Sequence, residues 1–71
     1  MLTPNLPEAS DLLGVPEAKN QAEMEGQASA ILELGPGAVL LKGGHLVGGH
    51  SPDLLATPQG LIWLDDSRHP T

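Results

Sequence analysis

The sequence contains no cysteine, phenylalanine or tyrosine, and Trp63 is its only aromatic residue. Without cysteine no disulfide can form, and the 39% of apolar residues must build a core almost entirely from aliphatic side chains. A chain this short buries only about 60% of the surface that its unfolded form exposes, so its stability is marginal. Since nothing staples so small a fold, we expect residues 1–71 to be a single partial domain, a piece of a larger one.

Basic residues are also scarce. Lys19, Lys42 and Arg68 stand against nine acidic residues, and the net charge is −6. Binding to a phosphate backbone requires clustered positive charge, so this composition predicts no nucleic-acid partner. There is no charged-then-apolar leader at Met1, and no apolar run approaches the length that spans a bilayer. We therefore expect a soluble, cytoplasmic protein without a membrane partner.

The first half of the chain predicts two helices. Pro4 favours an extended conformation for the residue before it, which could end a strand. Helical signals run over residues 5–13, and Gly14 stops them. A second helix is predicted from Asn20 to about Leu34. Its apolar residues share one face: Met24, Ala28, Ile31 and Leu32.

The second half predicts strands. Residues 38–41 are apolar without polar alternation, as expected of a strand covered on both faces of a parallel sheet. With the extended start and the helical crossover they form a right-handed βαβ unit. Residues 46–52 read as a loop, and residues 53–56 and 61–64 flank a plausible turn. The predicted fold class is α/β, a βαβ unit with parallel strands followed by a β-hairpin.

The tetrapeptide Lys42-Gly43-Gly44-His45 follows the predicted central strand directly. Glycines let the backbone approach a ligand closely, and the lysine adds one positive charge. Ligands of open α/β sheets collect at the carboxyl ends of the strands, where this loop would lie. The pattern therefore indicates a phosphate-binding loop, although a simple turn with a solvated Lys42 is the alternative.

Asn5 and Glu8 have the spacing of a helix capping box, and Asn20 and Glu23 repeat it. From the pattern alone, simple capping is the favoured interpretation of both pairs. A capped helix start can still face a metal ion.

Other polar residues carry weaker signals. The spacings of His45, His50 and His69 match no metal-ligand template, so exposed loop histidines are the favoured interpretation. Asp65-Asp66 is best explained as a solvated strand end, because neighbours on a strand point to opposite faces. Trp63 is most simply a hydrophobic cover for the hairpin.

Four motifs follow one another along the chain: Thr3-Pro4-Asn5-Leu6-Pro7-Glu8-Ala9, Leu34-Gly35-Pro36, Val39 to Leu46, and Asp53-Leu54-Leu55. Their order and spacing closely resemble the hydroxymethylpyrimidine/phosphomethylpyrimidine kinases of thiamine biosynthesis, in the ribokinase-like superfamily. The resemblance covers the whole chain but only an internal part of the family domain. It implies that the pyrimidine-binding strands and the Asn-Thr-His-Gly-Thr-Gly-Cys loop, with its anion hole and catalytic residue, lie elsewhere. No catalytic residue is therefore assigned here.

The resemblance implies a kinase that uses ATP and Mg²⁺. Asn5 and Glu8 fall on the superfamily's Asn-x-x-Glu motif, which holds Mg²⁺, directly or through water, and the nucleotide phosphates. Lys42, Gly43 and Gly44 fall on the loop beside those phosphates.

The parent enzyme implied by this resemblance would be a homodimer. It would phosphorylate the small molecule hydroxymethylpyrimidine and then its monophosphate, with pyridoxal or pyridoxine as alternative substrates. We expect the isolated segment to be inactive. The rival interpretation is a non-catalytic remnant or a small interaction module.

Overall fold

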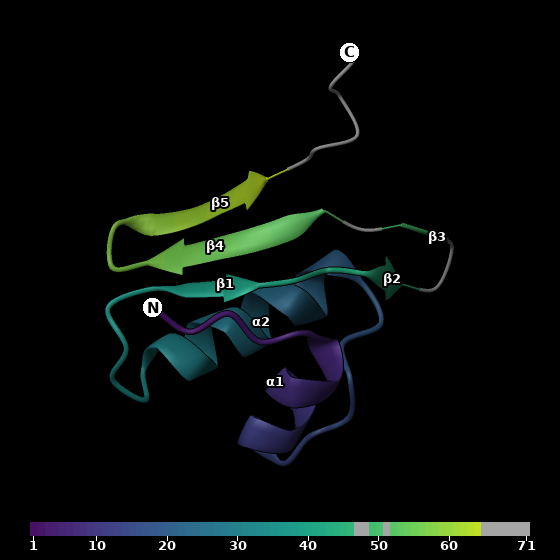
Figure 1. Cartoon of the computed structure of the whole chain (residues 1–71), viewed down its shortest axis with the longest axis horizontal. Coiled ribbons are helices and arrows are strands. Elements are labelled where there is room, and N and C mark those ends of the chain that lie inside the picture. Colours follow the sequence, from purple (N-terminus) through teal and green to yellow (C-terminus); the bar gives the residue numbers. More distant parts are fainter. Residues whose placement is uncertain (47–48, 51, 65–71) are drawn as a thin grey trace.

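The computed structural model describes residues 1–46, 49–50 and 52–64 (Figure 1). In these residues two helices precede a set of short strands: α1 (Leu6–Leu13), α2 (Gln21–Leu32), β1 (Val39–Leu41), β2 (His45–Leu46), β3 (Gly49–His50), β4 (Asp53–Thr57) and β5 (Gly60–Leu64). The larger sheet has the strand order β1-β4-β5, and β2 pairs with β3. Both helices lie on the same side of the larger sheet, which gives a partial α/β fold (Figure 1).

The larger sheet combines antiparallel and parallel neighbours. β4 pairs antiparallel with β1 and with β5. On the other edge of β1, the amino-terminal segment runs parallel to it. The Leu40 amide donates to the Leu2 carbonyl at 2.7 Å, and the Lys42 amide donates to the Pro4 carbonyl at 2.9 Å. The predicted parallel relation across the helical crossover is therefore present, and the predicted hairpin is formed by β4 and β5.

Two expectations about the strands are wrong. Val39 and Leu41 are fully buried whereas Leu40 is only half-buried, so the described helices cover one face of β1 and not both. A short aliphatic run cannot distinguish one covered face from two. Residues 46–52 are not simply a loop, because His45 pairs with His50 and Leu46 with Gly49. Glycine lowers strand propensity, but its backbone amide and carbonyl can still pair.

The helices begin and end largely where the sequence predicts. Gly14 ends α1 with φ 68°, and its amide donates to the Ser10 carbonyl at 2.9 Å. The left-handed conformation there suits glycine, which has no Cβ to clash. α2 ends at Leu32, slightly earlier than predicted. The amides of Leu34 and Gly35 donate three residues back, which makes a tighter final turn.

The core lies between the helices and the larger sheet. Its buried members come from both layers: Leu6, Ala9, Ala18, Met24, Ala28, Ile31, Val39, Leu41, Leu54 and Ala56. Trp63 packs against this core and covers the hairpin as predicted, and its indole also makes a polar contact with α2. No helix in the described part of the chain is long and apolar enough to cross a membrane.

Candidate functional site

The two motifs that carry the sequence prediction lie side by side. Asn5 and Lys42 are partners in a parallel β-bridge. β1 ends at Leu41 and α1 begins at Leu6, so the carboxyl end of the strand meets the amino-terminal end of the helix. Lys42 places a full positive charge at this corner. The helix start adds few free amides, because Pro7 has none and the Glu8 amide donates to Asn5 Oδ1. This corner can therefore attract a phosphate group.

A cavity of about 450 Å³ opens at this corner. The residues lining it come from three segments: Asn5, Leu6, Pro7, Glu17, Lys42, Gly43 and Gly44. They include every predicted nucleotide-binding residue except Glu8. Glu17 was missed by the sequence reasoning. It belongs to the connection between the two helices, and no local pattern indicated that this connection folds back onto the strand end.

Asn5 and Glu8 form a complete capping box. The Glu8 amide donates to Asn5 Oδ1 and the Asn5 amide donates to Glu8 Oε1, both at 2.9 Å. The structural interpretation of this motif is therefore correct. It does not exclude a binding role, because a carboxylate has a second oxygen that can meet an ion or its water.

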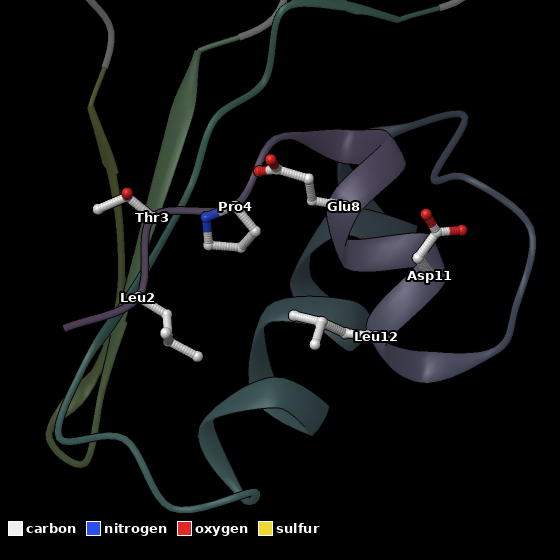
Figure 2. Close-up of a pocket in the computed structure, with 6 residues that line it drawn as sticks. All are labelled: Leu2, Thr3, Pro4, Glu8, Asp11 and Leu12. Carbon is white, nitrogen blue, oxygen red and sulfur yellow. The ribbon is translucent and has the colours of Figure 1, made fainter.

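The Glu8 side chain lines a neighbouring cavity of about 530 Å³, not the one that contains Lys42 (Figure 2). Leu2 and Leu12 point toward each other across this second cavity, whereas Asp11 points away from the amino-terminal segment (Figure 2). Glu8 thus lies on the helix start that lines the Lys42 cavity, but its side chain lines the neighbouring cavity.

One hydrogen bond and one glycine turn shape the loop after β1. The Gly43 amide donates to Asp53 Oδ1 at 2.9 Å, and Gly43 is buried. Gly44 has φ 60°, in the left-handed region that glycine adopts without strain. The chain therefore turns sharply after Lys42 with its backbone close to the cavity.

The second predicted capping pair, Asn20 and Glu23, does not form a reciprocal box. Asn20 Oδ1 caps α2 by accepting from the Glu23 amide at 2.8 Å, but Glu23 Oε1 accepts from the Lys19 amide. The reciprocal box therefore occurs only at Asn5. Glu23 also lines a third cavity, which contains neither Asn5 nor Lys42.

Metal-ligating residues are sparse in the described ranges. No group of three or more His, Asp or Glu side chains there could hold a metal ion. Mg²⁺ commonly binds through one or two protein groups together with waters and phosphate oxygens, so Asn5 and Glu8 fit that mode but not an all-protein cage. His69, Asp65 and Asp66 lie outside the described residues, and the side chains of His45 and His50 are not described.

The family model for phosphomethylpyrimidine kinase matches residues 1–71. The chain belongs to the phosphomethylpyrimidine kinase family. It is 52% identical over 60 residues to the hydroxymethylpyrimidine/phosphomethylpyrimidine kinase of Escherichia coli (strain K12), a match that covers 84% of this chain and 23% of that protein. The kinase of the same name from Rhizobium meliloti (strain 1021) is 44% identical over 68 residues, which cover 96% of this chain and 26% of the relative.

A solved structure supports the same assignment. The 2.06 Å crystal structure of phosphomethylpyrimidine kinase from Clostridium difficile 630 superposes with a TM-score of 0.77 at 39% identity. The superposition covers 87% of this chain and 26% of that structure. The fold is therefore part of the family's ribokinase-like fold, and the chain spans about a quarter of the length of the relatives it matches.

Proposed function

We propose that this segment forms the corner of a hydroxymethylpyrimidine/phosphomethylpyrimidine kinase that holds the phosphates of ATP together with Mg²⁺. The observation that carries the proposal is the pairing of Asn5 with Lys42 at the mouth of one cavity. The names of the relatives support a kinase, and they favour a pyrimidine alcohol and its monophosphate over pyridoxal as substrates.

Each residue has a distinct part in this proposal. Lys42 would neutralise phosphate charge, and no carboxylate among the described residues forms an ion pair with it. Gly43 and Gly44 would let the loop backbone approach the phosphates. Asn5 and Glu8 would orient Mg²⁺ through its waters from a rigid helix start. When bound, Mg²⁺ supplies charge neutralisation for phosphoryl transfer.

A graft tests the proposal. The matching 68 residues of the Rhizobium meliloti relative would be replaced by those of this chain, and ATP-dependent phosphorylation of hydroxymethylpyrimidine would be measured. We expect the graft to remain active. We expect Lys42→Met in the graft to weaken ATP binding or to slow transfer by about tenfold, since a charge-assisted contact is lost.

Thr57→Ala is the matched control for this graft. Thr57 Oγ1 bonds to the backbone at the β4–β5 turn, outside the residues that line the Lys42 cavity. It should leave the kinetics unchanged. A folded but inactive graft would contradict the proposal and favour the non-catalytic remnant.

A further inference from the structure

The Asp53 side chain contacts the loop that contains Lys42, although Asp53 has no part in the proposed function. Its Oδ1 accepts a hydrogen bond from the Gly43 amide at 2.9 Å, which joins the loop after β1 to the first residue of β4. A carboxylate acceptor strengthens such a bond. Gly43 is buried, so this loop conformation would be destabilised if the Gly43 amide had no acceptor.

The position of Asp53 follows from the sheet register. The β1–β4 ladder ends with the pair Leu41–Leu54, and Asp53 is the first residue of β4. Backbone pairing between the two strands therefore stops just before the Lys42 loop. The Asp53 side chain continues it by one further hydrogen bond.

The loop is thus tied to both of its neighbours. The Lys42 amide donates to Pro4 on the amino-terminal side, and the Gly43 amide donates to Asp53 on the β4 side. Gly44 then turns with φ 60°. Two adjacent amides with fixed acceptors leave the backbone at Lys42 little freedom to rotate, so the loop is formed before any ligand arrives.

We infer that Asp53 is a positioning residue, which holds the Lys42-Gly43-Gly44 backbone in the conformation that receives the nucleotide phosphates. This inference rests on the proposed function. Asp53 acts through the Gly43 amide and does not line the cavity itself. Its negative charge alone would repel phosphate, so any favourable effect on nucleotide binding must come from geometry.

The positioning role and a purely electrostatic role of Asp53 predict opposite changes in nucleotide affinity when its carboxylate is removed. The grafted kinase described above would be labelled with ¹⁵N and titrated with the Mg²⁺ complex of adenylyl imidodiphosphate, a non-hydrolysable ATP analogue. The Gly43 and Gly44 amide signals would report binding, and hydrogen exchange at Gly43 would report its hydrogen bond. We expect Asp53→Ala to speed Gly43 exchange about tenfold and to weaken analogue binding. A purely electrostatic role predicts tighter binding instead.

Two further variants complete the test. Asp53→Asn keeps an acceptor oxygen and removes the charge. Gly43 exchange should therefore speed up less than in Asp53→Ala, and analogue affinity should be kept or raised. Asp53→Ser places its oxygen too far away for the same bond and should give the same changes as Asp53→Ala. It keeps the test available if Asp53→Ala folds poorly. Thr57→Ala removes a side-chain bond at the opposite end of β4 and should move neither signal.

The outcomes separate the two proposals. If the unchanged graft shows no shift with the analogue, the proposed function and this inference are both overturned. If it does bind, but Asp53→Ala and Asp53→Ser bind as tightly with unchanged Gly43 exchange, only the positioning role is overturned.

Discussion

The indole N–H of Trp63 on β5 donates a hydrogen bond to Glu25 Oε2 on α2 at 3.0 Å. This contact joins the last described strand to the helix layer, and it is partly buried. The single aromatic residue of the chain therefore both packs on the core and fixes the hairpin against α2. It also reports on folding through its fluorescence.

We expect Glu25→Ala to lower the free energy of unfolding by about 1 kcal/mol, because the partly buried indole N–H loses its acceptor. Glu25→Gln keeps an acceptor oxygen and should cost less. Urea titration followed by Trp63 fluorescence and by circular dichroism measures both. Glu33→Ala, at the exposed end of α2, is the control, and equal losses for Glu25→Ala and Glu33→Ala would show that the hydrogen bond contributes nothing.

The 71-residue chain by itself should show no kinase activity. It spans about a quarter of its relatives, and the resemblance places the anion-hole loop and the pyrimidine pocket outside it. Stabilisation of developing charge usually supplies a large share of the catalytic rate. ADP release from ATP and hydroxymethylpyrimidine should match that of a sample without protein. Turnover clearly above that background would show that this segment contains a catalytic site.

The isolated chain should be marginally folded and prone to associate. Both edges of β1 are paired, so the strand edge at risk is that of β5, where Leu61, Ile62 and Leu64 are 40%, 53% and 43% exposed. An apolar strand edge is a template for pairing with another chain. Urea titration should give a broad transition, and sedimentation should show association that Ile62→Lys reduces. A sharp transition in a monomer, worth several kcal/mol, would contradict this.

Glu8→Gln in the grafted kinase should lower turnover and raise the Mg²⁺ requirement, with little loss of stability. The amide keeps an oxygen to accept from the Asn5 amide but removes the charge that favours the ion. Glu23→Gln is a close match, because Glu23 also accepts from a backbone amide at a helix start. It should leave the kinetics unchanged. Identical Mg²⁺ dependence in the two variants would show that Glu8 acts only as a helix cap.

Local signals were sufficient for much of this fold. α1 begins after Asn5 and ends at Gly14, as the side chain of Asn5 and the backbone freedom of Gly14 predict. The turn at residues 57–60 lies where the sequence indicates. The resemblance singled out Asn5 and Lys42, but their pairing depends on how the crossover returns to the sheet.

The missed features are all non-local. Glu17 reaches the cavity only because the helix connection folds back, and Asp53 reaches Gly43 only through the strand register. The partner of Trp63 is likewise set by how α2 packs on the sheet. No window of neighbouring residues contains this information.

If phosphate binds as proposed, the pairing of Asn5 with Lys42 would link ligand occupancy to folding. The two residues lie on either side of the helical crossover, so a phosphate held between them would bridge it. A ligand at one hundred times its dissociation constant stabilises the state that binds it by about 2.7 kcal/mol. For a marginal fold that is a substantial share of the total. Cellular nucleotide concentration would then help to set how much of this segment is folded at any moment.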